Sequence, residues 1–98
     1  MPEVRWTPLA ANDLEAISEF VSRDSPYYAN ILVLDVMAGI ERLAYFPHLG
    51  RLVPEVSDPQ IRELLLGNYR VIYRYRLQIV EVLTIYHSAR LLDPSTLK

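Results

Sequence analysis

The sheet-forming residues of this chain are concentrated in its last third, and this distribution most constrains the fold that it can adopt. From Ile61 to Arg90, valine, isoleucine, leucine and tyrosine dominate, whereas helix-like spacing of apolar residues is confined to the first half. At 98 residues, the chain is too short to divide into two units that each bury an adequate core. We therefore expect a single α+β domain over residues 1–98, with helices first and an antiparallel sheet after them.

Charge is divided unevenly along the chain. The segment from Ile61 to Arg90 holds five arginines and two glutamates, whereas the remainder holds five basic and ten acidic residues. Strands that place arginines side by side present a cationic surface, which suits phosphate or an acidic partner segment. The net charge of −2 argues against a protein that coats nucleic acid generally, but it leaves room for a local site.

Two capping signals divide the first half into a predicted helical hairpin. Thr7-Pro8 and Ser25-Pro26 each place a good N-cap residue before a proline, which is favoured at the first helical position. The first helix should cover Leu9 to about Val21 and the second should end at Tyr45 or Phe46. The two helices are expected to pack antiparallel on one face of the sheet.

The surfaces of the two predicted helices differ. The first is amphipathic, and its acidic side, which includes Asp13, is expected to face water. The second carries one apolar stripe for the core, but Ile31, Leu34 and Met37 are apolar as well and lie outside that stripe. This breadth indicates either a tight helix pair or a surface that binds a partner.

The remaining elements are predicted to be extended. Val4-Arg5-Trp6 is a short strand at the N-terminus, and an irregular connection rich in proline follows the second helix. Tight turns at Gly67-Asn68 and Leu77-Gln78 then separate three consecutive antiparallel strands. The strand near Val4 can join the same sheet, which would have three or four strands. The three strands of the meander are Ile61 to Leu66, Tyr69 to Arg76, and Ile79 to Tyr86.

Alternation along the middle strand sorts its side chains onto two faces. Tyr69, Tyr73 and Tyr75 should point toward the helices, where they would pack in the core rather than stack on bases. The opposite face, expected to be uncovered, would then display Arg70, Arg74 and Arg76. Like charges on one strand face repel each other and call for an outside counter-charge.

Several short sequence motifs follow one another in a recognisable order. They are Trp6-Thr7-Pro8, then Ala11, Asp13-Leu14 and Ile17, then Leu43, Phe46-Pro47 and Gly50-Arg51, then Ile61-Arg62-Glu63-Leu64, then Tyr69-Arg70-Val71-Ile72-Tyr73, and finally Ile85-Tyr86-His87-Ser88-Ala89-Arg90. In this order and spacing, the chain resembles the RelE/ParE superfamily of bacterial toxins that are encoded beside an antitoxin. The last motif, from Ile85 to Arg90, is more similar to the ParE branch than to the RelE branch.

The resemblance implies the toxin of a type II toxin–antitoxin pair, neutralised by a cognate antitoxin and touching operator DNA only through it. ParE-like toxins are associated with inhibition of DNA gyrase without a hydrolytic site of their own, and this is the interpretation we favour. One alternative is a RelE-like, metal-independent endoribonuclease that cuts messenger RNA on the ribosome. Another is an inactive member that serves only antitoxin binding and operon autoregulation.

Under the RelE-like alternative, the catalytic residues implied by the resemblance are Arg70, His87 and Arg90. Arg70 would bind phosphate and His87 would act as acid or base. Glu63 or Glu55 would replace the lysines of other members, because Lys98 is the only lysine. The competing interpretation of Arg70 is a cross-strand salt bridge with Glu63 or Glu81, and that of His87 is a structural residue at a strand end.

The candidate residues for binding a partner or an anion are Arg51, Arg62, Arg70, Arg74 and Arg90. Replacing Arg70 by glutamate is expected to weaken partner binding or toxicity while leaving the fold intact. No metal and no cofactor are expected, since the two histidines lie 39 positions apart and cysteine is absent. Without a leader-like N-terminus or an apolar run of membrane-spanning length, we expect a cytoplasmic protein with no membrane contact.

Overall fold

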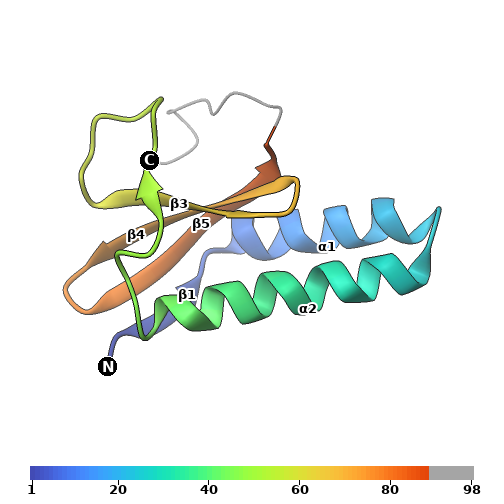
Figure 1. Ribbon diagram of the computed structural model, residues 1–98, viewed down its shortest axis with the longest axis horizontal. Coiled ribbons are helices and arrows are strands. Elements are labelled where there is room, and N and C mark those ends of the chain that lie inside the picture. Colours follow the sequence, from blue (N-terminus) through green and yellow to red (C-terminus); the bar gives the residue numbers. More distant parts are fainter. Residues whose placement is uncertain (89–98) are drawn as a thin grey trace.

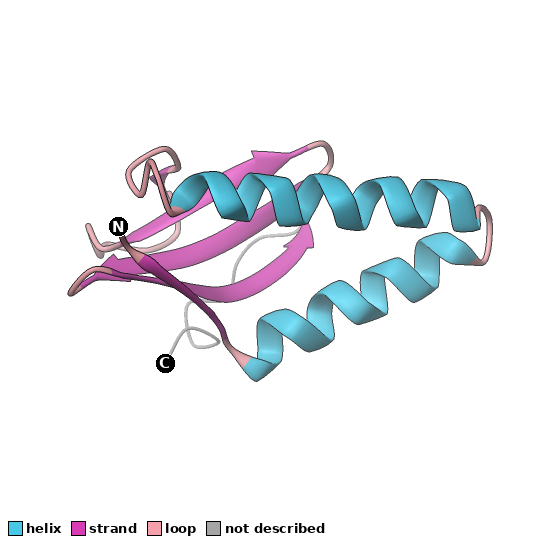
Figure 2. Ribbon diagram, turned by 90° about the horizontal axis from the view of Figure 1, so that it is seen from below, coloured by secondary structure: helices cyan, strands magenta, loops and turns pink. Residues whose placement is uncertain are grey.

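The computed structural model describes residues 1–88 and forms two layers, a helical hairpin packed against one face of a five-stranded sheet (Figures 1 and 2). The α+β class, the helical hairpin and the antiparallel meander are confirmed. The elements are β1 (Glu3–Trp6), α1 (Pro8–Ser22), α2 (Pro26–Leu43), β2 (Arg51–Leu52), β3 (Ile61–Leu66), β4 (Tyr69–Arg76) and β5 (Ile79–His87).

Both helices begin where the capping signals place them. The Thr7 side chain accepts a hydrogen bond from the backbone N–H of Ala10, and the Ser25 side chain accepts one from Tyr28. A proline occupies the first turn of each helix, where its missing N–H costs nothing. Helix α2 ends at Leu43, two residues before the earliest end that the sequence predicted.

The sheet has the strand order β1-β5-β4-β3-β2. Strand β1 joins it parallel to β5, and the other neighbours pair antiparallel. The fifth strand, β2, was not predicted, since it contains only two residues and lies within the irregular connection. Neither helix in the described part of the chain combines the length and the apolar character that crossing a bilayer requires.

The main core lies between the helices and the sheet. Ala10 of α1 and Val36 and Ile40 of α2 pack against Val71 and Val82 of the sheet. Tyr69 packs against this cluster, while Tyr73 packs with Leu43 and Val80 in an adjoining one. The predicted orientation of the tyrosines toward the helices is therefore confirmed for these two residues, and Tyr75 also packs beside Tyr73.

The hydroxyl of Tyr73 fixes the connection between α2 and the sheet. It donates a hydrogen bond to the carbonyl of Pro47 (2.8 Å) and accepts one from the N–H of Gly50 (2.9 Å). A Cβ at position 50 would lie 2.6 Å from the backbone carbonyl oxygen of Glu63 and 2.7 Å from the Tyr73 hydroxyl. Glycine is therefore required here for close approach of the chain.

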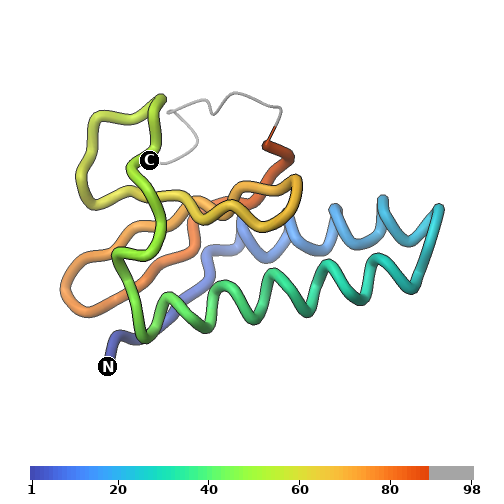
Figure 3. The backbone as a smooth tube through the Cα atoms, in the orientation of Figure 1, coloured from blue at the N-terminus to red at the C-terminus, as the bar shows by residue number. Residues whose placement is uncertain are grey.

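A second, smaller core lies on the face of the sheet away from the helices. Figure 3 shows the chain rising from the end of α2 past the sheet and looping over this face before it enters β3. Val53 from that loop packs with Ile61, Ile72 and Leu83 of the sheet. The expectation that this face is uncovered was wrong, because a loop with apolar anchors covers part of it.

Candidate functional site

Arg70 lies on β4, on the sheet face away from the helices, but its side chain is only 7% exposed. Its Nε donates to a carboxylate oxygen of Glu63 at 2.7 Å, and its two terminal nitrogens bind the two carboxylate oxygens of Glu55 at 2.9 Å each. Its guanidinium carbon also lies 5.1 Å from the centre of the Tyr86 ring. Arg70 therefore occupies the face that the sequence predicted, but it is buried there instead of displayed.

The loop over this face explains the burial. Val53 anchors it in the second core, and this brings Glu55 within bidentate reach of the Arg70 guanidinium. The apolar residues Val53 and Val56 among the prolines of the connection were the signal that a segment covers the arginines.

Glu63 joins Arg70 to a further arginine. Its side chain is fully buried, and its second carboxylate oxygen accepts a hydrogen bond from Nε of Arg51 at 2.6 Å. Among residues 1–88, Arg51, Glu63, Arg70 and Glu55 thus form one network of ion pairs, with two cations and two anions. Of the two salt-bridge partners considered for Arg70, the structure selects Glu63.

The hydrogen bond with Glu55 is the main cause that raises the pKa of Arg70, and burial acts against it. The hydrogen bond with Glu63 adds to the increase. Arg70 therefore remains charged, and the carboxylates of Glu55 and Glu63 compensate its charge inside the fold.

The other predicted arginines are divided between the two faces. Arg62 stands opposite Tyr73 in the register, which places it on the helix side of the sheet, and its guanidinium donates to the carbonyl of Gly50 at 2.8 Å. Arg74 lies on the same face as Arg70 and forms a salt bridge with Glu81 at 3.2 Å. Arg90 lies outside the described residues. Of the four candidates within residues 1–88, Arg51 and Arg70 are brought together by Glu63, whereas Arg62 and Arg74 bind other groups.

His87 and Arg70 lie on opposite faces of the sheet. His87 pairs with Tyr69, and the two rings contact edge to face at 5.6 Å, on the side that packs against the helices. Arg70 pairs with Tyr86 on the other side. Arg70 and His87, two of the residues that would share one phosphate in RNA cleavage, are therefore separated by the sheet.

A β-bulge in β5 causes this separation. Tyr73 pairs with Val82 and Ile72 pairs with Thr84, so that Leu83 is an extra residue without its own partner. An extra residue reverses the alternation of side chains after it. Without the bulge, His87 would have lain on the same face as Arg70.

Asp13 has a structural role that the helix pattern did not reveal. Its carboxylate accepts hydrogen bonds from the hydroxyl of Thr84 (2.5 Å) and the backbone N–H of Ile85 (3.0 Å). Strand β1 pairs with β5 only as far as Val82. Beyond that residue, backbone groups on this edge of β5 need other hydrogen-bond partners, and Asp13 provides one. The expectation that Asp13 faces water was wrong for this reason.

The phenol ring of Tyr86 lies against the guanidinium of Arg70. Burial raises its pKa to about 12, and the charge of Arg70 opposes that increase. Its hydroxyl oxygen is buried without a hydrogen-bond partner in the described part of the chain.

Within residues 1–88, no three His, Asp or Glu side chains come together as a metal site would require.

On the sheet face away from the helices, a group of arginines lies near the turn between β4 and β5. Arg5, Arg74 and Arg76 line a hollow of about 190 Å³ together with Glu81. Arg5 also pairs with Glu3 at 3.0 Å. Arg5, Arg74 and Arg76 define a cationic rim, in which the Arg74 side chain is 19% exposed, while Arg51 on β2 exposes 62% of its side chain elsewhere on the sheet.

Comparison with known proteins identifies the family. The family model described as the ParE toxin of the type II toxin–antitoxin system parDE matches residues 4–92. Toxin RelE2 of Caulobacter vibrioides is 34% identical over 92 residues, which cover 93% of this chain and 100% of that protein. Putative toxin Y4kP of Sinorhizobium fredii is 33% identical, covering 87% of this chain and 86% of its own length.

A solved structure agrees with these sequence relatives. A chain of the chromosomal ParDE toxin–antitoxin system from P. aeruginosa superimposes with a TM-score of 0.73 at 27% identity. The match covers 89% of this chain and 96% of that chain. The fold, the family model and the relatives agree, and the chain belongs to the ParE toxin family of type II toxin–antitoxin systems, within the RelE/ParE superfamily.

Proposed function

We propose that this chain is a ParE-like toxin that arrests growth by binding a macromolecular target, with DNA gyrase as that target, and that a cognate antitoxin neutralises it. The observation that carries the proposal is the placement of Arg70 and His87. Arg70 is held by Glu55 and Glu63, and His87 lies on the other face of the sheet. Metal-free RNA cleavage needs a cation and an acid or base at one phosphate. Binding without turnover fits this arrangement better, and it would take place in the cytoplasm.

Two assays with the purified chain test this function. We expect inhibition of the supercoiling activity of gyrase, with relief when the product of the neighbouring antitoxin gene is added in equal amount. In parallel, ribosomes carrying messenger RNA should show no new cleavage sites. Ribosome-dependent cleavage that is lost in His87→Ala would contradict the proposal in favour of an endoribonuclease. Failure to affect gyrase, ribosomes and growth would identify an inactive member that only binds its antitoxin.

Arg74 is the predicted partner-binding residue that lies on the exposed rim. Replacing it by glutamine removes the charge but keeps a group that can donate a hydrogen bond to Glu81. We expect Arg74→Gln to weaken antitoxin or gyrase binding about tenfold, which corresponds to about 1.4 kcal/mol. Calorimetric titration measures the change. The matched control, Arg23→Gln, alters an exposed arginine between the two helices and should leave affinity unchanged; equal losses in both variants would exclude the rim.

A further inference from the structure

The two-residue turn between β4 and β5 has a strained backbone. Arg76 and Ile79 are the last residues that pair across it, and Leu77 and Gln78 between them have φ values of 52° and 62°. Positive φ at both positions is typical of a type I′ turn, which favours asparagine and glycine. A leucine in this conformation is rare, because its Cβ approaches the backbone closely. The turn therefore carries a residue that its own geometry does not favour.

Leu77 also has the most exposed large apolar side chain within residues 1–88, with 87% of its surface accessible. Packing inside the fold therefore does not explain the leucine, and the backbone conformation opposes it. Strained residues are concentrated at sites where a function needs the side chain. Strain and exposure together suggest that Leu77 contacts a partner.

Strand β1 holds this turn in place. The backbone N–H of Glu3 donates a hydrogen bond to the carbonyl of Gln78 at 3.0 Å, and Glu3 pairs with Ile79 in the sheet. Figure 1 shows the turn at the edge of the molecule, at the opposite end from the connection between α1 and α2. A side chain on a fixed turn loses little conformational freedom on binding, which favours affinity.

The surroundings of Leu77 are cationic. It lines the same hollow of about 190 Å³ as the three arginines of the rim. Arg76 directly precedes it and is exposed, and the side chain of Arg5 is 59% exposed. An apolar side chain among arginines is complementary to an apolar pocket that is bordered by carboxylates.

We propose that Leu77 is the anchor with which this chain binds its target, and that it enters an apolar pocket bordered by carboxylates on a folded protein. The inference rests on the proposed function, since it names the part of the chain that recognises the target. A convex turn fits a concave pocket. A folded target protein offers such a pocket, whereas a single helix or strand of an antitoxin does not.

Duplex DNA is the other class of partner that an apolar residue among arginines suits, because such a residue can wedge between base pairs. Charge favours a protein instead. Arg5 and Arg74 already pair with Glu3 and Glu81, which reduces the attraction of the rim for phosphates. The net charge of −2 also opposes approach to the DNA backbone.

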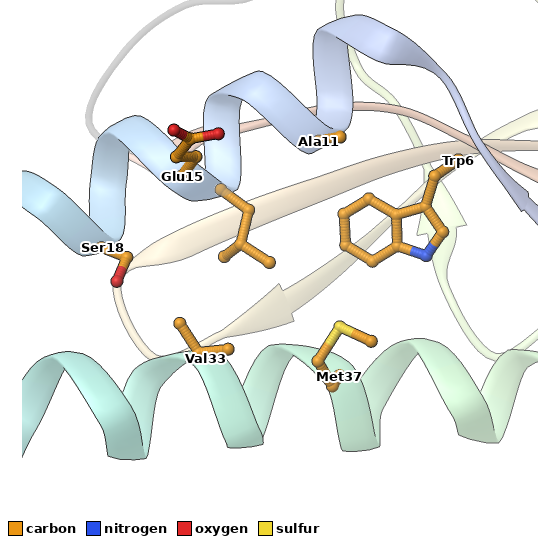
Figure 4. A pocket seen from close by; sticks show the side chains of 7 residues that line it. Trp6, Ala11, Glu15, Ser18, Val33 and Met37 are labelled. Atoms are coloured by element: carbon orange, nitrogen blue, oxygen red, sulfur yellow. The ribbon is translucent and has the colours of Figure 1, made fainter.

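A separate apolar surface lies on the helical layer. Ile31, Leu34 and Met37, the apolar residues of α2 outside its core stripe, are all exposed, so tight packing between the helices does not account for them. Figure 4 shows the pocket between the helices, with the Trp6 ring above Met37. Trp6 is the only tryptophan, and it lies at the end of β1 away from Gln78. Its fluorescence therefore reports on the helical layer and not on the turn.

The double variant Leu77→Asn/Gln78→Gly gives the turn the residues that its backbone favours and removes the anchor. We expect its midpoint of urea denaturation to rise by about 0.5 M, because the strain is relieved. Half-inhibition of gyrase supercoiling should require about tenfold more protein or worse, because a leucine is no longer buried in the target. Growth arrest on expression should weaken in parallel. Higher stability with lower activity separates a binding role from a structural one.

Three controls accompany the double variant. Leu65→Asn makes the same change at a leucine that is 47% exposed and stands opposite Arg70, at the other end of the sheet, and it should leave inhibition unchanged. Calorimetric titration should give the double variant the same affinity as the unaltered chain for the product of the neighbouring antitoxin gene. The emission spectrum of Trp6 should also be unchanged.

The anchor is overturned if the double variant inhibits gyrase and arrests growth as strongly as the unaltered chain, or if its antitoxin affinity falls as much as its inhibition. Binding of the unaltered chain to a short labelled DNA duplex, lost in the double variant, would also overturn it, because the partner would then be DNA. Growth arrest without inhibition of gyrase would contradict the proposed function alone, and loss of that arrest in the double variant would still support the anchor. A chain that affects neither would overturn both.

Discussion

Replacing Arg70 by glutamate is expected to unfold this domain or nearly so, with a loss of about 3 to 5 kcal/mol in the free energy of unfolding. The new carboxylate would lie beside Glu55 and Glu63, of which Glu63 is fully buried. Within residues 1–88, three anions would then lie together, and Arg51 would be the one cation bound to them. Urea denaturation followed by circular dichroism measures the loss.

Arg76→Glu provides the matched control, since Arg76 lies on the same strand and the same face but is exposed. Its effect should stay within about 0.5 kcal/mol. Equal stability of the two variants would contradict the burial of Arg70. The expectation from the sequence, that Arg70→Glu leaves the fold intact, depended on an uncovered face and is replaced by this one.

Removing the hydroxyl of Tyr73 is expected to cost about 2 to 4 kcal/mol, because it leaves two backbone groups unpaired. The N–H of Gly50 loses its acceptor and the carbonyl of Pro47 loses a donor, each at about 1 to 3 kcal/mol. Tyr86→Phe makes the same chemical change on β5, where the hydroxyl has no hydrogen-bond partner in residues 1–88. That variant should be unchanged or stabilised by up to about 1 kcal/mol.

Alkaline pH provides a second measurement on the same two variants. Burial raises the pKa of Tyr86 to about 12, whereas an unfolded tyrosine titrates near 10. Its contribution to stability is therefore complete below about pH 10 and is lost as the pH rises from 10 to 12. Tyr86→Phe should lose less stability over this range than the unaltered chain. Equal destabilisation by Tyr73→Phe and Tyr86→Phe at neutral pH would contradict the different roles assigned to the two hydroxyls.

Features set by neighbouring residues could be predicted from the sequence. The two caps, the Gly67-Asn68 turn and the starts of β3, β4 and β5 follow from local signals and agree with the structure. Leu77 and Gln78 form the other tight turn with positive φ values of 52° and 62°. The alternation of β4 also gave the correct face for Arg70 and Tyr73.

Features set by distant contacts could not be predicted. Alternation tells which face a side chain takes, but not whether a loop far along the chain covers that face, as the segment around Val53 covers Arg70. No residue type or spacing in the sequence marks the bulge at Leu83. It nevertheless places the side chains of His87 and Arg70 on opposite faces of the sheet. The face of Arg62, by contrast, follows from the alternation of β3, where Ile61 and Glu63 point the other way.

The central claim is that Arg70 is a buried cation held by Glu55 and Glu63 and not an exposed anion-binding group. The most direct test is a double-mutant cycle with Arg70→Met, Glu63→Leu and the double variant, each measured by urea denaturation. Because each single change leaves one buried charge without one of its ion-pair partners, we predict a coupling free energy of about 2 kcal/mol or more, with the double variant more stable than Arg70→Met. A coupling below about 0.5 kcal/mol, with Arg70→Met as stable as the unaltered chain, would contradict the claim.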